Sequence, residues 1–167
     1  ISSNPNTSGF YGYDKGFDTF LDFIKPSEQK EKNSKLFRYG KKLIKKIPYA
    51  YEFLTKFRSA HNLPYKRAEE MNEHILEQLE DGERQFLWAH YMDPHSPYSP
   101  PKEYGEKMCP DAYRERGKLS NKLYRKELGE DDTTKLRQLY NAEVKYLDDK
   151  LGDLLDEIEE SEESILI

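Results

Sequence analysis

The segment from residue 86 to residue 101 constrains the fold of this chain more than any other. It begins with an apolar run at residues 86–92, FLWAHYM, and continues with four prolines among residues 93–101. A short apolar run bounded by turns is typical of a strand buried on both faces. Proline lacks a backbone N–H and has a fixed φ, so residues 93–101 can form neither a helix nor a central strand. The segment predicts a buried central strand at about residues 85–92, followed by a stiff loop at its carboxyl end.

Helical periodicity surrounds this segment. Ala68, Met71, Ile75 and Leu79 recur at helical spacing and predict one helix. A long helix is predicted from residue 131, where Asp131 and Asp132 suit a helix start. Its apolar face is predicted to contain Leu136, Leu139, Tyr140, Leu147, Leu151, Leu154, Leu155 and Ile158. Residues 1–4 and 165–167 read as partial strands, and the order strand, long helix, strand indicates a parallel α/β crossover.

Composition narrows the class of protein. Hydrophobic and charged residues each make up 35% of the chain, which is lean for a self-contained α/β domain. Residues 25–67 hold 13 Lys and Arg against 3 Asp and Glu, whereas residues 127–163 hold 14 acidic against 4 basic residues. Such asymmetry fits either an anionic partner or solvated helix faces. The basic residues alternate with apolar ones at helical spacing, so we favour solvated faces.

The single cysteine and the lack of long apolar stretches exclude several kinds of site and segment. The single cysteine excludes an internal disulfide and a zinc site built from several cysteines. No apolar stretch approaches the roughly 18 residues of a membrane span, and no signal-peptide core is present at residue 1. Neither absence identifies a cellular compartment.

His95 is the strongest candidate for chemistry. Ligands of open α/β sheets collect beyond the carboxyl ends of the strands, where His95 is predicted to lie between two prolines. Its imidazole can bind an oxyanion when protonated, or transfer a proton. His90 falls within the predicted strand, and we interpret it as a core or supporting residue and a weaker candidate for substrate contact. Asp93 can orient His95 or cap the turn, and we favour the turn.

Other candidate residues have structural explanations. Cys109-Pro110 has no companion histidine at readable spacing, so we interpret the thiol as a bystander. Asp148 and Asp149 point about 100° apart on a helix, which suits a solvated face better than a shared metal ion. His61 and His74 fall on predicted surface segments. No residue of this chain is therefore predicted as a metal ligand.

Three segments together resemble the sulfatase family of the alkaline phosphatase superfamily. Residues 86–98, FLWAHYMDPHSPY, resemble the family's buried strand and Pro-His-x-Pro-Tyr loop. Residues 11–18, YGYDKGFD, are similar to its glycine-aromatic loop, and residues 140–152, YNAEVKYLDDKLG, to its Tyr-x-Ala-Glu-Val-x-Tyr helix. The resemblance implies one partial domain over residues 1–167, the central part of an alkaline phosphatase-like catalytic domain, with a helical insert at residues 26–85.

The family's chemistry is sulfate ester hydrolysis, in which a formylglycine acts as nucleophile beside a calcium or other divalent ion. A histidine in the Pro-His-x-Pro position contacts the sulfate, and this role falls on His95. Cys109-Pro110-Asp111 does not match the family's Cys/Ser-x-Pro-x-Arg nucleophile motif. We therefore expect that motif upstream, an Asp-His pair downstream, and no cofactor bound by this chain alone, which by itself should be inactive.

Alternatives remain at this stage. Phosphoester hydrolases and phosphoglycerol or phosphoethanolamine transferases share the superfamily, and the sequence does not separate their substrates from a sulfated small molecule or glycan. A different class of protein is a non-catalytic helical module that binds an anionic partner through its basic half. We do not expect nucleic acid to be the partner of the enzyme.

Overall fold

The computed structural model describes residues 1–23, 65–79 and 86–160. Its elements are a short 3-10 helix η1 (Gly9–Tyr11) and four helices: α4 (Ala68–Leu79), α5 (Lys102–Met108), α6 (Pro110–Arg125) and α7 (Glu130–Glu160). The predicted helices at residues 68–79 and from residue 131 are confirmed. The polar stretch between them, residues 102–125, forms two regular helices.

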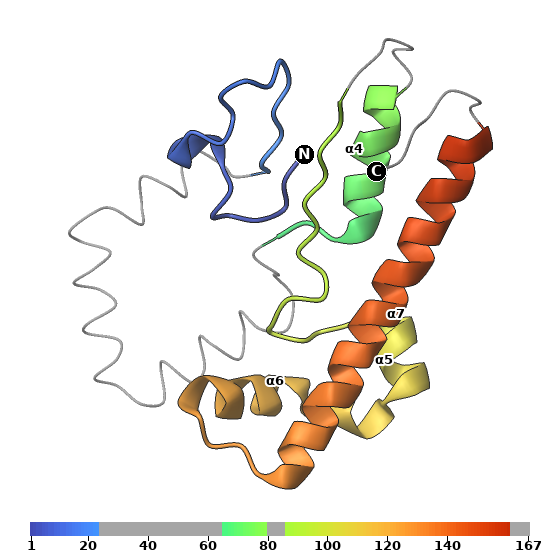
Figure 1. The fold of residues 1–167 in the computed structure, drawn as a ribbon. Coiled ribbons are helices and arrows are strands. Elements are labelled where there is room, and N and C mark those ends of the chain that lie inside the picture. The colour runs from blue at the N-terminus through green and yellow to red at the C-terminus, as the bar shows by residue number, and fades with distance from the viewer. Residues whose placement is uncertain (24–64, 80–85, 161–167) are drawn as a thin grey trace.

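Helix α7 is the spine of the described chain and packs against α4, α5 and α6 (Figure 1). Its amino-terminal half joins a core cluster made with α5 and α6: Cys109, Ala112, Leu119, Leu136, Leu139 and Ala142. Its carboxyl-terminal half packs against α4 through Ile75, Leu154 and Ile158. Tyr140 and Leu155, expected on the apolar face, are 41% and 38% exposed. The buried stripe instead includes Glu143 and Tyr146.

Helices α5 and α6 meet at one residue, Cys109. Its backbone N–H donates to the Gly105 carbonyl and ends α5, while its carbonyl accepts from the Tyr113 N–H at 2.8 Å and begins α6. Pro110 occupies the first turn of α6, where its missing N–H costs nothing. Gly105 allows the two helices to approach closely, because a Cβ there would lie 2.1 Å from Cδ2 of Tyr113.

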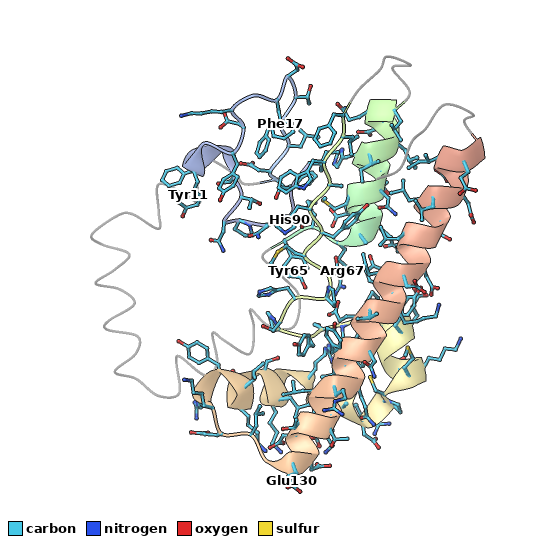
Figure 2. The ribbon with its side chains drawn as sticks, viewed as in Figure 1. Tyr11, Phe17, Tyr65, Arg67, His90 and Glu130 are labelled. Atoms are coloured by element: carbon cyan, nitrogen blue, oxygen red, sulfur yellow. The ribbon has the colours of Figure 1, made fainter. Side chains whose placement is uncertain are left out.

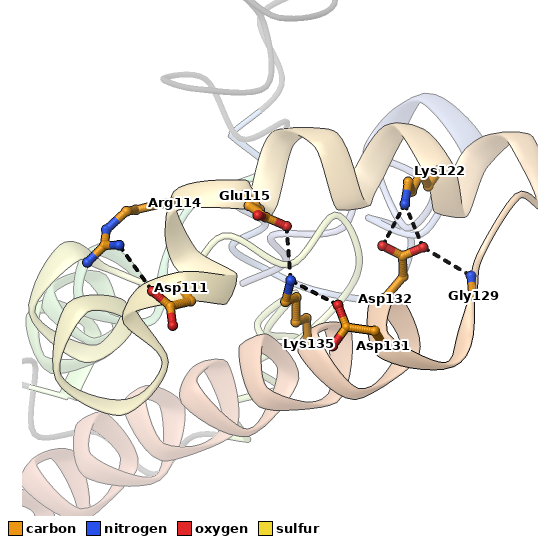
Figure 3. Close-up of polar contacts among 8 residues, drawn as sticks. All are labelled: Asp111, Arg114, Glu115, Lys122, Gly129, Asp131, Asp132 and Lys135. Atoms are coloured by element: carbon orange, nitrogen blue, oxygen red, sulfur yellow. Dashed lines mark hydrogen bonds and ion pairs between the residues drawn. The ribbon is translucent and has the colours of Figure 1, made fainter.

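Polar contacts fix the turn from α6 to α7 (Figure 3). Asp132 in the first turn of α7 accepts the Gly129 backbone N–H at 3.0 Å, as the N3 residue of a capping box does. The same carboxylate accepts two hydrogen bonds from Lys122 of α6, each at 2.7 Å. Lys135 in turn pairs with Asp131 and, across the turn, with Glu115. The expectation that Asp132 supports the start of the long helix is thus met.

The apolar segment at residues 86–92 is extended and runs between the amino-terminal loop and α4 (Figure 1). It pairs with the start of the chain through one isolated parallel bridge, Ser2 to His90. The His90 N–H donates to the Ile1 carbonyl and the Ser3 N–H to the His90 carbonyl, both at 3.0 Å. An isolated bridge is not a strand, so the partial strand at residues 1–4 stays a prediction.

No complete strand is present among the described residues, so the central strand at 85–92 stays a prediction. Burial on both faces is not observed, since Phe86 is 80% exposed and residues 87–92 are only half-buried. Only one isolated bridge pairs this segment within the described residues. The predicted partner at 165–167 lies outside them, as do His61 and most of the helical insert and basic region.

Candidate functional site

The loop at residues 93–99 carries His95 and is attached at several points to the helices. Its first turn is closed by the His95 N–H, which donates to the Met92 carbonyl at 2.7 Å. The Tyr65 hydroxyl donates to the His95 carbonyl at 3.5 Å. At the far end the Tyr98 ring packs edge-on against Tyr140 of α7, with 5.6 Å between centroids. The backbone around His95 is therefore held from both sides.

The His95 imidazole is exposed, and one of its nitrogens is already occupied. Nδ1 lies 2.6 Å from the Ser96 carbonyl oxygen. A carbonyl can only accept, so Nδ1 carries a hydrogen and donates it. This contact fixes the tautomer and leaves Nε2 as the nitrogen that can bind another molecule. No described residue forms a hydrogen bond with Nε2.

Arg67, which precedes α4 and lies beside the loop (Figure 2), contacts both ends of the loop. Its guanidinium lies 3.3 Å from Oδ1 of Asp93 and also donates to the Ser99 carbonyl. The guanidinium stacks over the Tyr146 ring of α7, 5.6 Å from the centroid. Asp93 is buried, and its carboxyl is held by Arg67 and by the Ala68 N–H at the start of α4. The role of Asp93 as a turn cap stays a prediction.

Glu143 of α7 also holds the loop. We call Asp93, Arg67 and Glu143 together the anchor of the loop. Its side chain is 0% exposed, and Oε1 accepts the Ser99 backbone N–H at 2.7 Å. Oε2 lies 3.9 Å from Nη1 of Arg67. Burial raises the pKa of Glu143 to about 7, against the lowering effects of the Ser99 N–H and Arg67. Burial also raises the pKa of Asp93, opposed chiefly by Arg67.

Two buried tyrosines flank the anchor. Burial raises the pKa of Tyr65, and the nearby Glu143 carboxyl adds to the effect. Burial likewise raises the pKa of Tyr146, whose hydroxyl accepts the Glu69 N–H at 3.3 Å. Both phenols therefore stay neutral across the physiological pH range. They act as packing and hydrogen-bonding groups around Arg67.

His90 lies apart from His95. Its Nδ1 is 3.3 Å from Oγ1 of Thr7, whose hydroxyl also bonds Ser2 at 2.6 Å. Its ring packs against Trp88, with 5.4 Å between centroids. No hydrogen bond or ring contact joins the two imidazoles in the part of the chain that the structure describes. His90 thus has the supporting contacts expected of it, and contact with substrate stays a prediction.

The described residues do not fit the nucleophile or the metal ion of the resemblance. Cys109 is buried, and burial raises the pKa of its thiol, which opposes formation of a thiolate. Asp93 and Glu143 face a guanidinium, which would repel a cation. Within the described ranges no three His, Cys, Asp or Glu side chains are placed to hold a metal ion. The Asp149 carboxylate accepts hydrogen bonds from Tyr104 and Lys145, so these groups and not a metal ion are its partners in the described residues.

In the described residues an anchored Pro-His-x-Pro-Tyr loop follows an extended segment, and helices pack around both. The model of the sulfatase family matches residues 2–167, essentially the whole chain. The chain belongs to the sulfatase family. No curated protein and no solved structure matches it. Among the described residues, no helix is both long and apolar enough to cross a membrane.

The sequence indicated His95 but not the residues that hold its loop. Arg67 lies before a predicted helix in a basic stretch, where nothing distinguishes it from its neighbours. Glu143 gave a readable signal, because it lies four residues after Leu139 on the helix stripe that is buried. A carboxylate at such a position requires a partner, which is Ser99 and Arg67 here.

Proposed function

We propose that this chain supplies the anion-contacting histidine of a sulfate ester hydrolase, and that His95 is that residue. One observation supports this most directly. The Ser96 carbonyl occupies Nδ1, so Nε2 of the exposed imidazole is left to bind another molecule, and the loop is anchored by Arg67 and by Glu143 of α7. Membership of the sulfatase family adds the substrate class. The substrate is a sulfated small molecule or glycan.

The chemistry follows from the imidazole. When His95 is protonated, Nε2–H donates a charge-assisted hydrogen bond to a sulfate oxygen. The same proton can pass to the leaving-group oxygen as the ester bond breaks. The anchored loop limits the motion of the ring, which reduces the entropy lost on reaching the reactive geometry. The calcium ion and formylglycine of the family belong to this proposal as groups held outside the described residues.

The test compares esters with one leaving group. The protein produced from its whole reading frame is assayed with 4-nitrophenyl sulfate, 4-nitrophenyl phosphate and bis(4-nitrophenyl) phosphate. We expect the highest kcat/KM for the sulfate ester, and no turnover by residues 1–167 alone even with calcium. Preference for a phosphate ester would replace the proposal with the phosphoesterase alternative. Salt-sensitive binding to anionic vesicles without any turnover would favour the binding module.

A further inference from the structure

Two buried carboxyl groups meet at the base of the His95 loop with a single guanidinium between them. Asp93 and Glu143 both have fully buried side chains, and Arg67 lies 3.3 Å from the first and 3.9 Å from the second. Both carboxyl groups face the same guanidinium nitrogen, Nη1 of Arg67, so they lie close to each other. Two ionised carboxylates and one cation would leave a net negative charge in a buried site, which is costly.

The hydrogen bonds of the four carboxyl oxygens also indicate that one proton is missing from the pair. Oδ1 of Asp93 is bonded to Arg67 and Oε1 of Glu143 to the Ser99 N–H. The remaining oxygens, Oδ2 of Asp93 and Oε2 of Glu143, are buried without a hydrogen bond among the described residues. Two carboxylates cannot bond each other, because both only accept. One added proton would satisfy both oxygens and make the cluster neutral.

We propose that Asp93 and Glu143 share one proton, carried by Glu143, and that this pair with Arg67 positions the His95 loop. Glu143 is the better carrier, because Arg67 lies closer to Asp93 and the Ala68 N–H at the start of α4 also stabilises an ionised Asp93. The positioning role rests on the proposed function of His95. The shared proton does not.

The pH dependence follows from the environment of Glu143. The titratable or charged groups that face it are Arg67 and Asp93, with Tyr65 beside them and Tyr146 on the other side of Arg67. Burial raises the pKa of Glu143 from 4.5 to about 7. The folded chain therefore holds a proton between these values that the unfolded chain has lost. Stability falls as the pH rises through this window and is constant above it.

The variant Glu143→Gln isolates the shared proton. Its amide oxygen can accept the Ser99 N–H, and its NH₂ can donate to Asp93 at every pH. We expect it to match the wild type at pH 5 and to melt about 5–10 °C higher at pH 8.5. Glu157→Gln, an exposed change on the same helix, should follow the wild-type profile. Identical pH profiles for Glu143→Gln and the wild type would overturn the proposal.

A second measurement reads the site directly and does not depend on catalysis. The amide proton of Ser99 donates to Glu143, so its NMR chemical shift should titrate with a midpoint near pH 7 in the wild type. This titration should be absent in Glu143→Gln, and also in Asp93→Asn, where Arg67 and Glu143 balance each other. A Ser99 amide that does not titrate in the wild type would show that no proton is shared.

The positioning role is read from turnover by the protein made from its whole reading frame. Glu143→Gln should extend kcat to higher pH than the wild type while KM changes little. If the ratio of kcat between Glu143→Gln and the wild type is the same at every pH, the anchor does not position the His95 loop. If no ester is cleaved by either protein while Ser99 still titrates, the proposed function fails and the shared proton stands. If esters are cleaved and Ser99 does not titrate, the proposed function stands and the shared proton fails.

Discussion

The Arg67 guanidinium donates to the backbone carbonyl of Ser99, 32 residues further along the chain. The same side chain pairs with Asp93, so one cation bridges the first and last residues of the His95 loop. Arginine suits this position because its planar fork can serve two acceptors at fixed angles. The loop therefore depends on a residue from outside its own sequence.

Replacing Arg67 with methionine should strongly destabilise the chain. The change leaves the buried Asp93 carboxylate without its cation, and the loss of one partner of a buried pair costs about 3–5 kcal/mol. Urea denaturation at pH 7 measures the free energy of unfolding. Arg67→Lys should lose less, since the charge remains while the fork is lost. A loss below about 0.5 kcal/mol for Arg67→Met would mean that the pair does not stabilise the fold.

Replacing His95 with alanine should reduce turnover without destabilising the protein. The ring is exposed, and its loss removes a group expected to supply about 10²–10⁴-fold in rate. The kcat for 4-nitrophenyl sulfate and the melting temperature are measured together. His74→Ala, which removes a surface histidine paired with Glu77, is the matched control and should leave kcat unchanged. Equal kcat for His95→Ala and wild type would exclude a catalytic role.

The helices were predictable because their signals are local. Ala68, Met71 and Ile75 recur at helical spacing and are all buried on α4 as expected. The strand at 85–92 was inferred from an apolar run, a pattern that gives no information about the pairing partners. Only the bridge from His90 to Ser2 is present among the described residues. Strand formation depends on distant partners, which a local pattern does not contain.

The candidate site was predictable only in part for a related reason. Proline spacing and position singled out His95 before any contact was known. The anchor could not be found this way, because Arg67 and Glu143 lie on different elements and meet only through tertiary packing. A pattern of charge or hydrophobicity describes one helix or loop at a time. The anchor instead joins three separate parts of the chain: the His95 loop, the residue before α4, and α7. Only Glu143 carried a local signal, because a carboxylate on a buried helix stripe requires a partner.

Helix packing at Gly105 yields a prediction about stability. In Gly105→Ala the new Cβ would lie 2.1 Å from the Tyr113 ring, so the two helices must shift. Overpacking of this kind costs about 1–3 kcal/mol. Gly117→Ala in α6 is the matched control, because no atom lies within 4 Å of its Cβ, and it should stabilise by about 0.5–1 kcal/mol. Thermal unfolding of both variants checks the pair, and equal effects would contradict the close contact.

The Asp132 carboxylate should make the stability of α7 depend on acid pH. Hydrogen bonds from Lys122 and then from the Gly129 N–H lower the pKa of Asp132. A lowered folded-state pKa means that the contribution is complete above the ordinary carboxyl pKa of about 4 and is lost as the pH falls through the folded value. Asp132→Asn should therefore melt below wild type at pH 7, with the difference shrinking below pH 4. Asp148→Asn, an exposed change on the same helix, should show no such convergence.

The end of α6 offers a stabilising substitution. Lys126 follows the last residue of α6 in the left-handed conformation, with φ of 60° and ψ of 36°. Its N–H bonds the Leu123 carbonyl and the next N–H bonds Lys122, so this conformation is needed to close the helix. A side chain with a Cβ is strained there by about 1 kcal/mol, whereas glycine is not.

Lys126→Gly should therefore raise the free energy of unfolding by up to about 1 kcal/mol, because part of the gain is offset by greater freedom in the unfolded chain. Lys118→Gly, inside the same helix, should lower it by about 1 kcal/mol. Urea denaturation of the two variants gives opposite signs if Lys126 holds this conformation in solution, and a loss of stability in both would show that it does not.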